Sequence, residues 1–237
     1  MPFPKISCWP AGAGNDITGV AIMIGVLDLQ GDVVEHLDHL ERLGIAARRV
    51  KDPAHLHDLK GLIIPGGEST CLARLLRIFG IDAAIMEAYE RGVKIWGTCA
   101  GAILLATRIV GEKPYLGLID MEIERNSFGS QLDSFTATAS IPRVSSDPVP
   151  LTFIRAPKIR SVGTGVEILL QTDDYIAAAE TAGILVTVFH PELTNNLAFH
   201  RHFSQKCGLA AGESPPLADP TWTPTSWTRH SRVNSAA

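Results

Sequence analysis

The sequence lacks the features that mark disulfide-rich secreted proteins, membrane proteins and nucleic-acid-binding proteins. Only four cysteines occur in 237 residues, none at C-x-x-C spacing, which argues against a disulfide framework or a zinc site and favours a reducing, cytoplasmic location. No apolar run approaches the roughly 20 residues that span a bilayer. The net charge of −4 provides no basic surface for nucleic acid or anionic membranes. Small polar metabolites or another protein remain as partners.

The composition is otherwise that of a globular chain, with 46% hydrophobic and 19% charged residues. Periodic patterning begins at Met23, so residues 1–22 are predicted to be an extension outside the fold, with a signal peptide as the alternative. Residues 23–208 are predicted to form one domain. The remainder, 209–237, is rich in Pro, Ser and Thr without a period and is predicted to be disordered.

The first half of this domain alternates between short apolar runs and helical periods. The apolar runs, each predicted to be a strand, are 23–29, 45–50, 61–65 and 93–96. The helical stretches begin at Val33 and continue at 69–79, 82–91 and 102–110. This rhythm predicts an α/β fold of three layers, with a central, mostly parallel sheet flanked by helices.

The period changes between about 115 and 190. Short runs such as 121–124, 135–141, 166–170 and 184–189 predict further strands, some of them antiparallel. A closing helix at about 193–207 places Phe199, Phe203 and Cys207 on one face.

The pentapeptide GTCAG at 97–101 lies between the strand 93–96 and the helical run 102–110. A nucleophile between glycines at a strand–helix turn forms a nucleophile elbow. There the helix N-terminus favours a thiolate on Cys99, and the amide of Ala100 is free to face an oxyanion. The alternative is a structural cysteine in a tight turn.

Two further motifs end predicted strands. His190-Pro191-Glu192 follows the run 184–189, and an imidazole oriented by a carboxylate is what a cysteine nucleophile needs. The loop PGGEST at 65–70 offers glycine amides to a ligand, although a plain turn with Ser69 as helix cap explains it equally well. Neither motif is diagnostic alone. Together with the elbow they converge at the carboxyl edge of one sheet, where open α/β folds place their sites.

With Cys99, His190 and Glu192 as its triad, the chain resembles class I glutamine amidotransferases, and among them the glutaminases of pyridoxal 5′-phosphate synthase. The strings that carry the resemblance are LDLQGD (27–32), IIPGGEST (63–70), WGTCAG (96–101), ERNSFGSQ (124–131), FIRAP (153–157) and FHPEL (189–193). The likeness runs from Met23 to Gly208. Ser130 departs from it, since the family pattern has an arginine there.

The resemblance implies a role for each matching residue. Those expected to bind L-glutamine are Gly67, Glu68, Ser69, Arg125, Ile154 and Arg155. Gly67 and Ala100 are expected to supply the oxyanion amides, and Gln30 is expected to lie near the oxyanion region at the partner interface. No metal or cofactor is expected.

The implied activity is hydrolysis of L-glutamine to glutamate and ammonia through a cysteine thioester. The ammonia would pass to a lyase-type synthase subunit, in a hetero-oligomer that makes pyridoxal 5′-phosphate as its product. One alternative is the glutaminase of another pathway, such as imidazole glycerol phosphate synthase. The other is a non-catalytic scaffold that retains the fold.

The remaining candidate side chains are assigned structural roles. His36, His39, His200 and His202 are expected to lie at the surface, and Cys71 is expected to pack at the start of a helix.

Overall fold

The structure is a computed structural model, and it describes residues 23–125 and 134–212. The predictions for residues 1–22, for Ser130 and for nearly all of the tail lie outside these ranges. The last described residues continue past the predicted boundary at 208, since the amide of Gly212 donates to the carbonyl oxygen of Leu43 at 3.0 Å.

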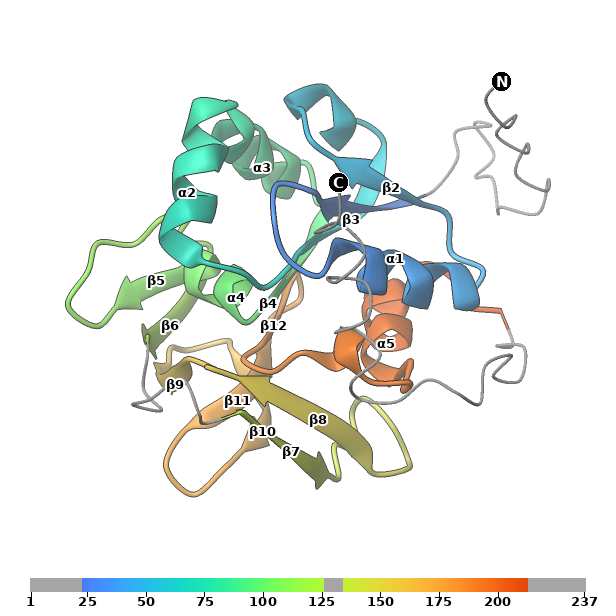
Figure 1. Ribbon diagram of the computed structural model, residues 1–237, viewed down its shortest axis with the longest axis vertical. Coiled ribbons are helices and arrows are strands. Elements are labelled where there is room, and N and C mark those ends of the chain that lie inside the picture. The colour runs from blue at the N-terminus through green and yellow to red at the C-terminus, as the bar shows by residue number, and fades with distance from the viewer. Residues whose placement is uncertain (1–22, 126–133, 213–237) are drawn as a thin grey trace, which may run out of the picture.

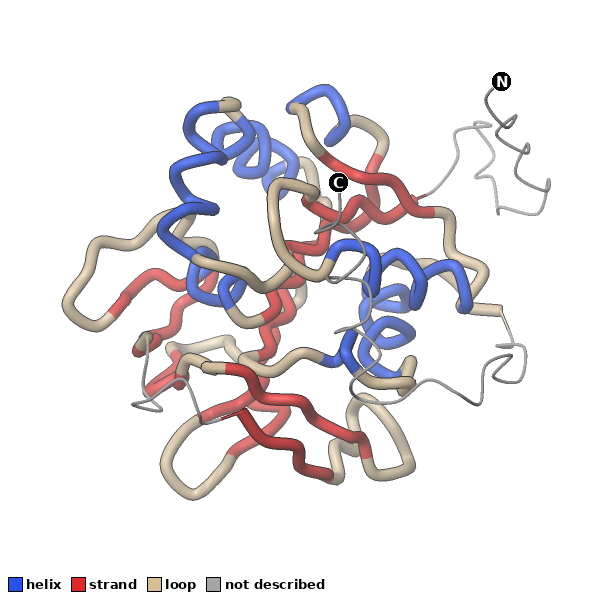
Figure 2. The backbone as a smooth tube through the Cα atoms, in the orientation of Figure 1, coloured by secondary structure: helices blue, strands red, loops and turns tan. Residues whose placement is uncertain are grey.

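Ten strands of the described residues form one sheet (Figures 1 and 2). In spatial order they are β2 (Ala47–Val50), β1 (Met23–Leu27), β3 (Leu59–Ile64), β4 (Lys94–Thr98), β12 (Ile184–Thr187), β11 (Ile176–Glu180), β9 (Lys158–Val162), β6 (Ile119–Glu124) and β5 (Ala106–Ile109), with β10 (Glu167–Gln171) paired to β11. The half from β2 to β12 is entirely parallel. Antiparallel pairs join β12, β11, β9 and β6. The predicted α/β sheet, mostly parallel with antiparallel strands in the second half, is thus confirmed.

Helices cover both sides of the parallel half (Figure 1). On one side α1 (Val33–Arg42) packs on α5 (Ala198–Lys206), and on the other α2 (Ser69–Ile78) packs on α3 (Ile81–Glu90) and α4 (Ala100–Leu105). Two short 3-10 turns, η1 (Pro53–Leu56) and η2 (Pro191–Leu193), and a separate β7 (Ser134–Ala139)–β8 (Val149–Ile154) pair complete the described fold. Every helix in these ranges is too short or too polar to span a bilayer.

The core under α5 is aromatic, and the predicted apolar face of that helix builds it. The Phe199 and Phe203 side chains are fully buried and Cys207 is 9% exposed. The Trp96 ring from β4 lies 5.5 Å from the ring of Phe203 and is itself fully buried. Close packing extends to β3, where Gly61 leaves the space that the Phe203 ring and the Cys207 sulfur fill.

Two predicted boundaries were wrong. The helical run 102–110 is a helix only to Leu105, because Ala106 turns to extended backbone (φ −66°, ψ 139°) and Ala106–Ile109 pairs with β6. The closing helix begins at Ala198 rather than near 193, because η2 and a loop precede it. In the first case edge-strand pairing outweighs local helix propensity.

Candidate active site

The carboxyl ends of three adjacent strands bring the predicted motifs together. β3, β4 and β12 lie side by side in parallel, with Ile64 paired to Gly97 and Thr98 paired to Thr187. The glycine loop, the elbow and the H-P-E segment follow these strands directly, so parallel register alone places them at one edge.

The elbow has the strained geometry that its glycines suggest. Cys99 has φ +47° and ψ −104°, and its amide donates to the carbonyl oxygen of Thr187 at 2.8 Å. A Cβ on Gly97 would lie 2.6 Å from the backbone carbon of Gly101, and a Cβ on Gly101 would overlap the carbonyl oxygen of Ile64. Both glycines therefore permit close backbone contact, which holds a non-glycine residue in a rare conformation at the site.

His190 faces the elbow, and hydrogen bonds to Glu192 and Thr152 fix its orientation. Its Nδ1 lies 2.8 Å from Oε1 of Glu192, which is 1% exposed, and its backbone amide donates to the carbonyl oxygen of Thr152 at 2.8 Å. Burial lowers the pKa of His190, but its contacts with Cys99 and Glu192 outweigh burial and raise that pKa well above 6.5. Cys99, some 90 residues earlier in the chain, thus forms one cysteine–imidazole–carboxylate array with His190 and Glu192.

A second carboxylate, which the sequence analysis did not single out, also faces this imidazole. Oδ2 of Asp32 lies 3.3 Å from Nδ1 of His190. Asp32, His190 and Glu192 bring their ligand atoms within 4.8 Å of one another, as a metal site would, but the Glu192 hydrogen bond already engages Nδ1. The signal was the position of Asp32 beside the turn Gln30-Gly31, directly after the first strand.

The glycine loop lies against both the triad and the first loop of the chain. A Cβ on Gly66 would come 2.5 Å from Cε1 of His190 and 3.5 Å from Cβ of Cys99. Gly67, at φ +137°, lies against the side chain of Gln30, whose Nε2 donates to the carbonyl oxygen of Glu68 at 2.6 Å. Gln30 is therefore close to the predicted oxyanion region.

Glu68 caps α2, a role the sequence analysis considered for Ser69. Its carboxylate accepts from the amides of Thr70 and Cys71 at 2.9 and 2.6 Å, while Ser69 is the first helical residue and is buried. Burial opposes the shift, but these two amides, with Arg125, lower the pKa of Glu68. The capping carboxylate therefore stays ionised beside the site.

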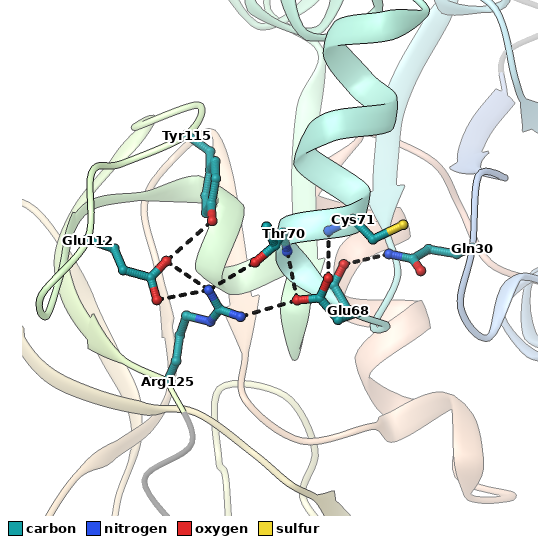
Figure 3. Close-up of polar contacts among 7 residues, drawn as sticks. All are labelled: Gln30, Glu68, Thr70, Cys71, Glu112, Tyr115 and Arg125. Atoms are coloured by element: carbon teal, nitrogen blue, oxygen red, sulfur yellow. Dashed lines mark hydrogen bonds and ion pairs between the residues drawn. The ribbon is translucent and has the colours of Figure 1, made fainter.

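Arg125 joins this cap to Glu112, in the segment between β5 and β6, as Figure 3 shows. Its Nη2 donates to Oε1 of Glu68 at 3.2 Å, and its Nη1 donates to both carboxylate oxygens of Glu112 at 2.7 and 2.9 Å. Nη1 also reaches the Thr70 hydroxyl at 3.2 Å. The Arg125 side chain is only 18% exposed, and these acceptors hold its guanidinium in place.

These groups surround a pocket of about 420 Å³. The predicted site residues among its lining are Gly67, Glu68, Ser69, Cys99, Ala100, Arg125, Ile154, Arg155 and His190. Arg155 has φ +44°, a second strained non-glycine backbone at this site. Glu192 lies behind His190 and Gln30 lies behind the glycine loop, outside the lining.

The surface assignments made from sequence were partly wrong. His36 and His200 are fully buried and His39 is 2% exposed, because α1 and α5 pack on each other over the sheet. His202 is partly buried against Glu180, at 2.9 Å. Cys71 is exposed rather than packed, whereas Cys207 is buried and burial raises its pKa to about 12.

The fold and the site define an α/β enzyme of the cysteine-dependent amidotransferase class. A solved structure described as a glutamine amidotransferase superposes with a TM-score of 0.74 at 43% identity, covering 79% of this chain and all of that one. The profile of the SNO glutamine amidotransferase family matches residues 26–209. The chain belongs to the SNO glutamine amidotransferase family.

Two relatives bear more specific names. One from Syntrophus aciditrophicus is 64% identical over 87% of this chain and 93% of its own length, and is named pyridoxal 5′-phosphate synthase subunit PdxT. One from Clostridium botulinum bears the same name and is 48% identical over 78% of this chain and 97% of its own length.

Proposed function

We propose that this chain hydrolyses L-glutamine at Cys99 and supplies the ammonia to a pyridoxal 5′-phosphate synthase subunit, in vitamin B6 biosynthesis. The observation that carries the proposal is the array of Cys99, His190 and Glu192 at the carboxyl edge of an amidotransferase fold. Two of its members, Cys99 and His190, line the pocket, and Glu192 fixes the imidazole from behind.

The chemistry follows from this geometry. His190 takes the proton of Cys99, and the thiolate attacks the side-chain amide carbon of glutamine. The amides of Gly67 and Ala100 hold the oxyanion; Ala100 begins α4, so its N–H has no intrahelical partner. His190 then gives the proton to the departing nitrogen, which leaves as ammonia. Water, deprotonated by the same imidazole, hydrolyses the glutamyl thioester and releases glutamate.

The charged rim of the pocket suits the amino-acid end of glutamine. The Arg125 guanidinium and the Glu68 carboxylate are of opposite sign and lie together, as the α-carboxylate and α-ammonium of the substrate require. Ser69, Ile154 and Arg155 would complete the contacts from both sides of the pocket. We therefore propose that glutamine lies with its amide at Cys99 and its charged end at Arg125.

The partner is proposed from the names of the relatives and from the energetics of the reaction. Ammonia released without an acceptor is wasted, so a hydrolase of this kind gains from activation on docking. Gln30 contacts Gly67 and Glu68, which makes the β1–α1 loop a route from a docked partner to the oxyanion amides. Both proteins would meet in the cytoplasm, in a hetero-oligomer.

The test is glutamate release by the purified chain, with and without a pyridoxal 5′-phosphate synthase subunit. We expect the synthase to raise the rate and an imidazole glycerol phosphate synthase subunit to leave it unchanged. Cys99→Ala should remove activity and remain folded, while Cys71→Ala, the matched control in an exposed cysteine, should retain it. Activation by the imidazole glycerol phosphate synthase subunit alone would contradict the proposed partner. Activity in the Cys99→Ala variant would contradict the proposed mechanism.

A further inference from the structure

Glu112 makes the two shortest contacts of the Arg125 guanidinium, although it lies outside the pocket lining (Figure 3). Nη1 of Arg125 donates to Oε1 of Glu112 at 2.9 Å and to Oε2 at 2.7 Å. The contacts on the other side of the guanidinium are longer, at 3.2 Å to the Thr70 hydroxyl and 3.2 Å to Oε1 of Glu68. The place of a pocket side chain therefore depends most on a residue behind it.

Hydrogen bonds hold the segment that carries Glu112. Its amide donates to the carbonyl oxygen of Ile109, the last residue of β5, at 3.1 Å. The Leu116 amide donates to the carbonyl oxygen of Leu104 in α4 at 2.9 Å, so both ends of the segment are attached to regular structure. The Tyr115 hydroxyl donates to Oε2 of Glu112 at 3.4 Å. The carboxylate of Glu112 is thus presented to Arg125 from a fixed position.

Arg125 needs such a restraint because its side chain is long and directly follows β6. A free arginine side chain occupies many rotamers, and ordering it when a ligand binds lowers the affinity. Glu68 supplies little of this restraint, since its carboxylate already accepts from the amides of Thr70 and Cys71 as the cap of α2. A second carboxylate that orders the guanidinium before binding removes most of this loss.

The contacts of Arg125 leave one edge of its guanidinium available. The group has five N–H donors in one plane. Nη1 directs its hydrogens to Glu112 and Thr70, and Nη2 directs one to Glu68. Among the described residues, no acceptor takes the Nε hydrogen or the second hydrogen of Nη2. These two hydrogens lie parallel on one edge, as a carboxylate requires for two hydrogen bonds.

We propose, on the basis of the function proposed above, that Glu112 is a positioning residue for substrate binding, which holds Nη1 of Arg125 so that the Nε–Nη2 edge receives the α-carboxylate of L-glutamine. Arg125 contacts the substrate, and Glu112 acts through Arg125. Because Glu112 occupies Nη1 only, it does not compete for the hydrogens of that edge. A carboxylate that did compete with the substrate would have the opposite effect, since its removal would tighten binding.

The experiment measures kcat and KM for L-glutamine, with the synthase subunit present, in Glu112→Ala, in Arg125→Met and in the double variant. For Glu112→Ala we expect KM to rise about threefold to tenfold, the effect of one side chain that must be ordered on binding, and kcat to stay within about twofold. In the Arg125→Met background, Glu112→Ala should change KM by less than about twofold, because the group that it positions is absent. The Glu112 side chain is 39% exposed, so these variants should fold.

Two further variants separate the hydrogen bond from a general effect of charge. The side-chain oxygen of Glu112→Gln can still accept from Nη1, so its KM should lie closer to the wild-type value than that of Glu112→Ala. Glu90→Ala removes an exposed carboxylate from α3, outside the pocket lining, and should keep the wild-type KM. An equal rise of KM in the alanine and glutamine variants at position 112 would overturn the proposal. An unchanged or lower KM in Glu112→Ala would overturn it too, as would a rise that persists in the Arg125→Met background.

Binding without turnover distinguishes this inference from the proposed function. In the Cys99→Ala background, calorimetry gives the Kd of L-glutamine, and adding Glu112→Ala should raise that Kd about threefold to tenfold even if the wild-type chain hydrolyses no glutamine. The Kd of 4-aminobutanamide, which is glutamine without its α-carboxylate, should not change. Hydrolysis by the wild-type chain together with an unchanged Kd of L-glutamine would overturn the role of Glu112 and leave the proposed function intact. An equal rise for both ligands would also overturn it.

Discussion

Oδ2 of Asp32 lies 3.3 Å from Nδ1 of His190, the nitrogen that Glu192 also binds. One imidazole N–H therefore faces two carboxylates, one buried and one at the pocket wall. The buried carboxylate fixes the ring, while the partly exposed one adds negative charge that favours the protonated ring.

Asp32→Asn should narrow the active pH range from the alkaline side. The carboxylates raise the pKa of His190, so removing one charge lowers that pKa, and the imidazolium is lost at a lower pH. We expect the basic limb of kcat/KM for glutamine to move down by about half to one pH unit. Asp38→Asn makes the same charge change on α1, away from the site, and should leave the profile unchanged. An identical basic limb in Asp32→Asn would contradict this role.

Gly66→Ala should impair catalysis more than folding. The added Cβ would come 2.5 Å from Cε1 of His190, so the imidazole must move away from Cys99. A displacement of about 1 Å at a catalytic group costs on the order of a hundredfold in rate, so kcat should fall by that order. Gly212→Ala, where the nearest atom is 3.7 Å away, is the control. Wild-type kcat in Gly66→Ala would show that the imidazole has more room than the structure indicates.

Arg125→Met should weaken glutamine binding. The guanidinium is the cation of the pocket rim and is held by Glu68 and Glu112, so its loss removes the proposed contact to the α-carboxylate. We expect KM to rise at least about tenfold, which is the effect of losing one charge-assisted contact, and kcat to change less. Arg108→Met removes an exposed ion pair with Asp120 and should leave KM unchanged. A lower kcat at constant KM would assign Arg125 to the chemical step instead.

Glu180→Gln should change the acid stability of the fold. Burial opposes the shift, but hydrogen bonds from His202 and Lys206 lower the pKa of Glu180 to about 2. The ionised Glu180 side chain therefore stabilises the fold fully at pH values above its unfolded-state pKa near 4.5, and this stabilisation is lost as the pH falls towards 2.

At neutral pH we expect Glu180→Gln to lower the free energy of unfolding by about 2 kcal/mol. This is less than the whole pKa shift of Glu180 would give, because some neighbouring charges are solvated. The difference from wild type should shrink below pH 4, as urea unfolding at several pH values would show. Glu167→Gln, which removes an exposed partner of Arg143, should cost almost nothing. A loss of unfolding free energy that does not change with pH would contradict the role of the lowered Glu180 pKa.

Local patterning predicted the parallel half of the sheet well, because buried parallel strands are short apolar runs between turn residues and helices. It failed at Ala106–Ile109, where the local pattern predicts a helix but pairing with β6 makes the segment an edge strand. It also misplaced His36, His39 and His200, because no local pattern distinguishes a solvated histidine from one buried against a histidine 161 or 164 residues away in the sequence.

The sequence by itself determined the chemistry available at this site. A nucleophile between glycines, a histidine and carboxylate after a strand, and a glycine loop need only local conformation to be recognised, because strand ends and tight turns restrict the residues that fit them. Only the tertiary structure decided which charges face that chemistry. Asp32 reaches the triad from a separate loop, and distance and burial, which set its effect on the His190 proton, exist only once the chain has folded.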